Sequence, residues 1–288
     1  MVMRRYVPGR DPLTRRRTCH ILRMRLVLAA LVLAALSLAP RAARAQHDHG
    51  AHHGEGEHAG APASSFSAAL GVITAGYDAM LYRGDYQGLA ATGRWARGRF
   101  DAALGMTGYR LQKNGKTVTG LGDLMLHGRA TALHAGAITA GAVAMVMMPT
   151  GDHDAGLGMG HVMLMPGGWI QWAPGRLALA ASAGYARGLG GGDIHAAHGG
   201  GAWPLVDPMT SSELTFGASG MIALAASLRA GLRADGAVPT GSGAARLAGG
   251  VRAVWTLGRV ETTAELQGGL AGAPFDLRGL VEAAVRFD

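Results

Sequence analysis

Apolar and polar residues alternate with a period of two along several segments of this chain, and this alternation constrains the fold more than any other feature. The pattern is present in residues 227–235, 260–267 and 279–287. A period of two belongs to an extended strand with one apolar and one polar face, and it excludes an amphipathic helix. In the clearest segment, Val260, Thr262, Ala264 and Leu266 alternate with Glu261, Thr263, Glu265 and Gln267.

Glycine-rich joints divide the chain after residue 65 into about twelve strands. The joints after the second, fourth, sixth, eighth and tenth strands are tight, whereas those after the third, fifth, seventh and ninth are longer. Short turns at one end and long loops at the other are typical of bacterial outer-membrane barrels, and strands of about 11 residues fit a tilted membrane span. The expected strands lie near residues 66–82, 86–96, 99–111, 119–133, 136–148, 160–173, 176–188, 211–222, 226–238, 246–257, 259–270 and 278–287.

We therefore predict an all-β fold, a transmembrane antiparallel up-and-down β-barrel spanning residues 66–288. An even number of strands places both ends of the barrel on the short-turn side, which is the periplasm. No segment after the N-terminal region reads as a long apolar helix, so a helical membrane protein is not expected.

The first 45 residues have the order of a secretory signal peptide. Arginines between Arg15 and Arg25 precede an apolar run at 26–39, and Ala43-Arg44-Ala45 forms a cleavage site. This segment holds ten of the 27 Lys and Arg and one of the 19 Asp and Glu, which leaves 17 basic against 18 acidic side chains. The rest of the chain is therefore close to neutral, and we expect no nucleic-acid partner. Cys19, the only cysteine, lies in the signal, which excludes disulfides and thiolate metal sites afterwards.

Residues 46–58, QHDHGAHHGEGEH, follow the cleavage site and begin a tail that continues to residue 65 as a polar, small-residue linker. A short histidine-rich tract is a compositional signal for binding Cu(II), Zn(II) or Ni(II). The alternative is a disordered, solvated tail in the periplasm whose imidazoles become charged at mildly acidic pH. The histidines are His47, His49, His52, His53 and His58.

Three short motifs resemble those of a known family. TGLGDLML at 119–126, MMPTGD at 147–152 and VPTGSG at 238–243 are similar to the G-L-G-D and L-P-T-G motifs of outer-membrane proteins grouped with the phenol-degradation MetA-pathway family of putative transporters. The resemblance covers roughly residues 66–288. It implies a β-barrel in the bacterial outer membrane, surrounded by lipid and associated with the passage of small molecules.

Charged residues recur on one face of the last four expected strands, which in a barrel faces the lumen. They form either a structural ladder of ion pairs that fills the lumen or a ring that sets the selectivity of a channel. The set is Arg229, Arg233, Arg252, Glu261, Glu265, Glu282 and Arg286.

A second inward set combines thioethers with imidazoles on three neighbouring expected strands. Such ligands suit Cu(I), although methionine also serves as an adaptable apolar filler. These candidate metal ligands are Met125, His127, Met145, Met147, His161, Met163 and Met165.

The sequence as a whole favours an outer-membrane channel or transporter for small solutes. One alternative is a protein for the export, resistance or sequestration of copper or zinc. It would use the histidine-rich tail and the inward-facing methionines and histidines of the lumen. The other is a non-conducting structural barrel. No H-E-x-x-H, G-x-S-x-G, P-loop or dinucleotide motif is present. We therefore expect no enzymatic activity and no required cofactor.

Overall fold

A computed structural model describes residues 64–79, 82–189, 211–241 and 243–287. Among these residues, no helix has the length and apolar character needed to cross a membrane. The strands are β1 (Ser64–Ala79), β2 (Tyr82–Arg97), β3 (Phe100–Lys113), β4 (Lys116–Leu121), β5 (Leu124–Ala135), β6 (Ile138–Met148), β7 (Val162–Trp172), β8 (Leu177–Leu189), β9 (Ser212–Ala225), β10 (Leu228–Pro239), β11 (Arg246–Leu257), β12 (Val260–Ala271) and β13 (Leu277–Phe287).

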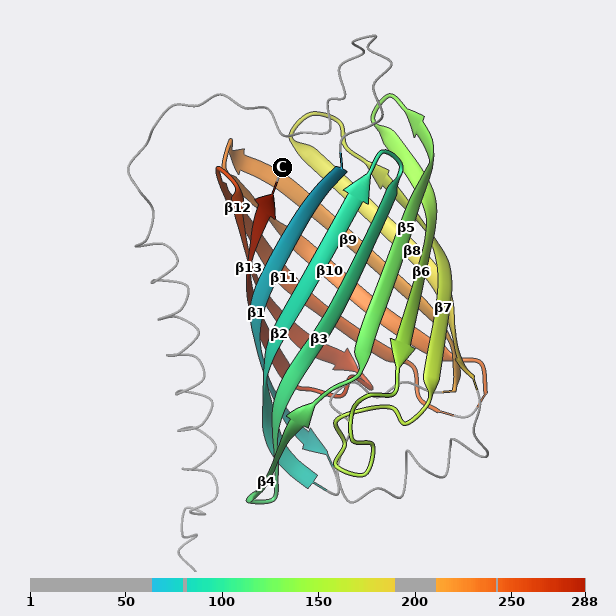
Figure 1. Cartoon of the computed structure of the whole chain (residues 1–288), viewed down its shortest axis with the longest axis vertical. Coiled ribbons are helices and arrows are strands. Elements are labelled where there is room, and N and C mark those ends of the chain that lie inside the picture. Colours follow the sequence, from blue (N-terminus) through green and yellow to red (C-terminus); the bar gives the residue numbers. More distant parts are fainter. Residues whose placement is uncertain (1–63, 80–81, 190–210, 242, 288) are drawn as a thin grey trace, which may run out of the picture. The chain divides into compact units, whose positions relative to one another are not determined.

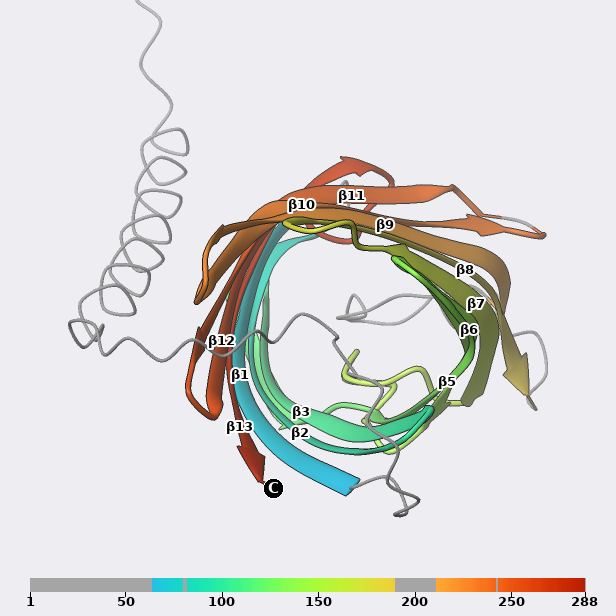
Figure 2. The same cartoon turned by 90° about the horizontal axis from the view of Figure 1, so that it is seen from above.

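Antiparallel pairing connects all of these strands into one sheet that closes on itself (Figures 1 and 2). Apart from β4 and β5, each strand pairs with its sequence neighbours, and β1 pairs with β13, which closes the ring of strands. Strands β4 and β5 both pair with β3, β4 along Gly108–Lys113 and β5 along Phe100–Gly105. β4 and β5 together therefore fill one strand position beside β3. The thirteen strands thus form a barrel of twelve strand positions, which confirms the predicted fold class.

One expected strand, at 119–133, is not continuous. It breaks at Gly122 and Asp123, between β4 and β5. The Gly122 amide donates a hydrogen bond of 2.8 Å to the Thr107 carbonyl. A Cβ at Gly122 would lie 2.6 Å from the Tyr109 ring, so only glycine lets the backbone pass this close. The break releases Asp123 from the ladder and makes it available to a neighbouring loop.

The outer face of the barrel is apolar. Every strand from β1 to β13 exposes at least one large hydrophobic side chain, and Leu232 (66%) and Leu70 (63%) are among the most exposed. Proteins in water rarely expose such a continuous apolar belt, whereas a barrel in lipid requires one. Other members of this belt are Phe66, Leu89, Phe100, Leu104, Leu126, Ile170, Phe216, Val251 and Val285.

The tight turns gather at one end of the barrel. Gly98, Gly136, Gly175 and Gly258 lie in four of the five tight turns and have φ between 56° and 62°. This left-handed conformation suits the twist of a short hairpin and is accessible to glycine at little cost. Ser64 at the start of β1 pairs with Arg97, and Phe287 at the end of β13 pairs with Phe66, so both barrel ends lie at this tight-turn end.

Candidate channel lumen

The charged residues predicted on the last four strands lie on the inner face of the barrel wall. Strand register places Arg252 opposite Glu265 and Thr263 opposite Glu282. Several of these side chains line an internal cavity, while their strand neighbours, such as Val251, are exposed on the apolar outer face. The alternation of the sequence thus divides inward from outward residues on β10–β13.

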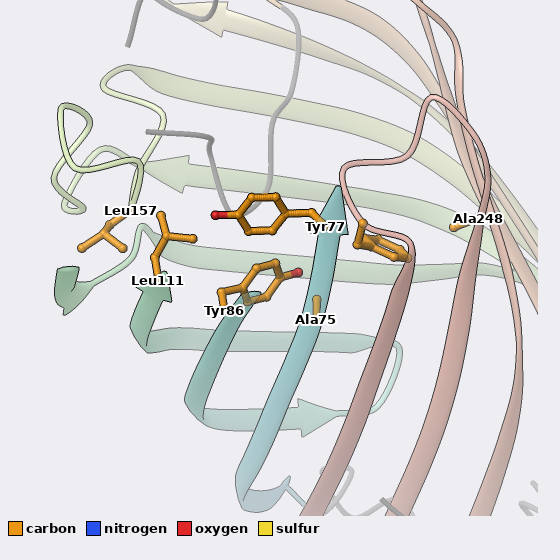
Figure 3. Packing of buried hydrophobic residues seen from close by; sticks show 7 residues of the cluster. Ala75, Tyr77, Tyr86, Leu111, Leu157 and Ala248 are labelled. Carbon is orange, nitrogen blue, oxygen red and sulfur yellow. The ribbon is translucent and has the colours of Figure 1, made fainter. Parts of the chain in front are cut away.

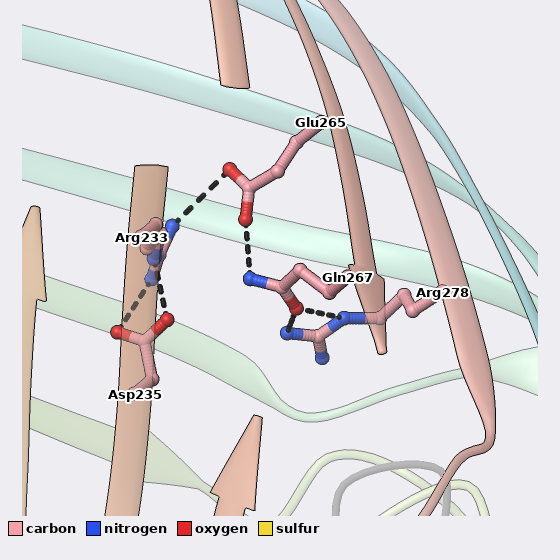
Figure 4. Close-up of polar contacts among 5 residues, drawn as sticks. All are labelled: Arg233, Asp235, Glu265, Gln267 and Arg278. Carbon is pink, nitrogen blue, oxygen red and sulfur yellow. Dashed lines mark hydrogen bonds and ion pairs between the residues drawn. The ribbon is translucent and has the colours of Figure 1, made fainter. Parts of the chain in front are cut away.

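A chain of polar contacts crosses β10, β12 and β13 (Figure 4). The Arg233 guanidinium donates to Asp235 at 2.5 Å and to Glu265 at 3.4 Å. Glu265 in turn accepts from Gln267, and Gln267 accepts from Arg278. Asp235, Gln267 and Arg278 were not in the predicted set. Each lies two or four residues from a predicted member on the same strand, so a stricter use of the period of two would have found them.

In the described part of the chain, the most deeply buried charge is Glu213 on β9. Arg246 on β11 donates to both of its carboxylate oxygens at 2.7 Å. The pair crosses over β10, which lies between the two strands. The sequence analysis missed this pair, because the two residues are 33 positions apart and neither belongs to a charged motif.

A cavity of about 390 Å³ occupies the tight-turn end of the lumen. Three charges of its lining, those of Arg94, Asp101 and Glu261, take part in short ion pairs. Arg94 donates to Asp101 at 2.5 Å, and Arg229 donates to Glu261 at 3.2 Å. The charged residues of the cavity lining are Arg94, Arg129, Arg252, Arg259 and Arg286 together with Asp101, Glu261 and Glu282.

The remaining charges of this lining are mostly positive. Glu282 is the carboxylate left after those two pairs, and the lining also holds Arg129, Arg252 and Arg286. Arg129 stacks its guanidinium 3.3 Å from the Trp169 ring centroid. Among the described residues, the Arg252 Nε atom is buried without a hydrogen-bond partner. A buried donor of this kind costs free energy. The surplus of guanidinium groups over carboxylates in the lining makes the cavity suited to an anion.

Residues 149–161, between β6 and β7, form a loop that lies inside the ring of strands (yellow-green in Figure 2). Asp123 holds both arms of this loop, because its carboxylate accepts from the Gly151 amide at 2.9 Å and from the Met159 amide at 2.7 Å. The Thr150 hydroxyl adds a bond of 3.1 Å to the Gly122 carbonyl. The G-L-G-D and P-T-G-D segments of the sequence therefore meet here and form a clamp.

The same loop also packs into a cluster with side chains of β1, β2 and β3 (Figure 3). Leu157 is 2% exposed and belongs to a buried cluster with Tyr77, Tyr86, Leu111 and Phe275. Phe275 comes from the connection between β12 and β13. Two connections thus place apolar side chains within the loop end of the lumen, which narrows the path there.

The predicted thioether and imidazole residues form two rows across three strands. Pairing aligns Met125 with Met147 and Met163, and His127 with Met145 and Met165. Met147, Met163 and Met165 are buried and cluster with Met159, with Met145 packed beside them. His161, immediately before β7, is also buried. The sequence analysis missed Met159, because this residue reaches the methionine cluster only when the loop 149–161 folds into the barrel.

Histidines 47, 49, 52, 53 and 58 lie outside the described residues. Within the described part of the chain, no group of three or more His, Cys, Asp or Glu side chains is arranged to hold a metal ion. Asp152 and His153 instead stabilise their own loop, since Asp152 accepts from the Ala155 amide at 3.0 Å and His153 Nδ1 lies 3.3 Å from the Gly158 carbonyl.

Comparisons with known proteins rest on structure. No family model and no curated protein sequence matches the chain. An outer membrane channel from Pseudomonas putida F1 superposes with a TM-score of 0.57 at 14% identity, covering 84% of this chain and 100% of that one. The NanC porin gives 0.48 at 7% identity, covering 77% and 99%, and the translocator domain of autotransporter NalP from Neisseria meningitidis gives 0.47 at 14%, covering 81% and 90%. At these identities the likeness concerns the fold, and this chain has the fold of an outer-membrane β-barrel.

Proposed function

We propose that this protein is a channel of the bacterial outer membrane through which small solutes pass. The apolar outer belt and the closed sheet fit a lipid environment, in which every backbone polar group must be paired within the protein. At its tight-turn end the lumen holds a cavity of about 390 Å³, which is large enough for a small solute. The likeness to the Pseudomonas channel supports the fold on which the proposal rests.

The observation that carries the proposal is the surplus of arginine in this cavity. If the polar side chains only filled the lumen, their charges would be paired with one another, as those of Arg246 and Glu213 are. Here Arg252 and Arg286 line open volume with Glu282 as the nearby carboxylate of the lining. A ring of guanidinium groups attracts anions and repels cations, so we infer that small anionic solutes are preferred over cationic ones.

The orientation and the processing of the chain are part of the same proposal. Both barrel ends lie at the tight-turn end, which in this class of barrel faces the periplasm. The histidine-rich residues 46–58 would then extend into the periplasm after removal of a signal peptide at residue 45. Membership of the phenol-degradation MetA-pathway family is supported by the motif residues, since Gly122, Asp123, Thr150 and Gly151 meet in one clamp.

Conductance of the purified protein in planar lipid bilayers tests the proposal. We expect discrete current steps in potassium chloride, and a reversal potential of the sign for anion preference in a salt gradient. A correctly folded barrel that carries no current would overturn the proposal and leave a structural role. Repeating the recordings with copper or zinc, on the chain with and without residues 46–58, shows whether the tail acts on the current.

A further inference from the structure

We propose that the buried methionine cluster beneath the loop 149–161 binds a soft monovalent metal ion, Cu(I) or Ag(I). The ligands are the imidazole of His161 and the thioethers of Met163, Met159 and Met147. The site is separate from the arginine-lined cavity, and it does not depend on the channel proposal.

The geometry around His161 carries the inference. Its Nδ1 lies 2.9 Å from the Met159 carbonyl oxygen, which only accepts hydrogen bonds, so Nδ1 carries the proton in the neutral ring. The lone pair of that ring is then on Nε2, which lies 3.0 Å from the Met163 sulfur. A thioether also offers a lone pair and no hydrogen. Two such lone pairs repel each other, and a cation held by both atoms, either a metal ion or a second proton on the ring, removes this repulsion.

The surroundings select the kind of cation. Met147, Met159 and Met163 are each 5% exposed or less, and they belong to one packed cluster. Thioether sulfur and imidazole nitrogen are ligands that favour Cu(I), whereas Ca²⁺ and Mg²⁺ require oxygen. A buried site of neutral ligands also holds a single positive charge at lower cost than a double one. Packing alone explains the burial of the methionines, whereas the contact between the His161 Nε2 and the Met163 sulfur places two soft ligand atoms side by side.

The position of the site links the ion to the lumen. Met159 belongs to the loop 149–161, Met147 to β6 and Met163 to β7. The Asp123 carboxylate already fixes the Met159 amide at 2.7 Å. A bound ion would therefore join the inward loop to two strands of the wall, and we expect it to immobilise the loop.

Nuclear magnetic resonance of the full chain labelled with ¹³C-methyl methionine tests the site. Titration with silver nitrate in chloride-free buffer is expected to shift the methyl signals of Met147, Met159 and Met163. Residues 46–58 contain no methionine, so silver held by the histidine tail does not produce these shifts. Met148 lies on the outer face and is 41% exposed, and its signal should stay in place.

Three variants complete the test. Met163→Leu and His161→Gln are each expected to weaken silver binding at the cluster by tenfold or more, since even partners outside the ligand shell typically contribute about 10-fold to 100-fold. Met148→Leu is the matched control and should bind as the unchanged protein does. A Leu for Met exchange keeps the core volume, so folding is preserved. Silver titration without shifts of the cluster methyl signals, or equal binding by the three variants, would overturn the proposal. Either result leaves the conductance test of the channel unaffected.

Discussion

The carboxylate of Asp123 fixes the loop 149–161 through two backbone amides. Substitution Asp123→Asn keeps the size of the side chain but removes its charge, and one of the two acceptor positions becomes an NH₂ group. A hydrogen bond to a charged group contributes about 1.5–3 kcal/mol, so docking of the loop should weaken about tenfold or more. We expect a higher single-channel conductance in planar bilayers, because the loop leaves the lumen more often.

Asp154 provides the matched control for this change. It lies in the same loop and is exposed, so Asp154→Asn removes the same charge without touching the clamp. Equal conductance of the two variants would show that Asp123 does not hold the loop in place.

Gly158 tests the same clamp from the loop side. A Cβ at this position would lie 2.5 Å from Asp123 Oδ1 and 2.8 Å from backbone atoms of Gly151, which cannot move aside without opening the loop. We expect Gly158→Ala to increase hydrogen exchange at the Met159 amide, which Asp123 protects. Gly93→Ala, where a Cβ meets no atom within 4 Å, is the control. Unchanged exchange in Gly158→Ala would contradict the clamp.

At the scale of strands, the Glu213–Arg246 pair connects β9 to β11 across β10. Its two side chains are 1% and 17% exposed. Breaking a buried ion pair from one side leaves an uncompensated charge and typically costs about 3–5 kcal/mol. Glu213→Gln should therefore lower the free energy of unfolding in urea by roughly this amount. Glu261→Gln removes the half-exposed partner of Arg229 and should cost no more than about 1 kcal/mol. Similar losses in both variants would contradict this ranking.

Most strands could be predicted from the sequence, because each alternates over enough residues to set its own faces. The register of β12, for example, follows from Glu261, Thr263, Glu265 and Gln267, all of which face inward. The break at Gly122 and Asp123 could not be predicted this way, because it depends on Tyr109 and on a loop 28 residues later. Met159 and the Glu213–Arg246 pair escaped for the same reason, since the closed sheet brings together residues that are distant in sequence.

For the whole molecule, the balance of charge in the lumen determines which ions pass. A unit charge roughly 6 Å from the path of an ion changes its energy by about 0.7 kcal/mol in a water-like medium, which is about a threefold change in permeability. We expect Arg252→Gln to lower the ratio of chloride to potassium permeability by about this factor. Glu282→Gln should raise the same ratio, because it removes the opposing charge from the same cavity.

The reversal potential in a gradient of potassium chloride measures this ratio directly. The more dilute side should be kept near 0.1 M, where charges act over about 10 Å, because higher salt screens them. Arg187 is the control residue: it is exposed and pairs with Leu164 on the outer face of the barrel, so Arg187→Gln should leave the reversal potential unchanged. Opposite shifts from the arginine and glutamate variants identify the cavity as the point that distinguishes ions. If both variants shift the potential in the same direction, or if neither does, the arginine surplus lies outside the conducting path and selectivity arises elsewhere in the lumen.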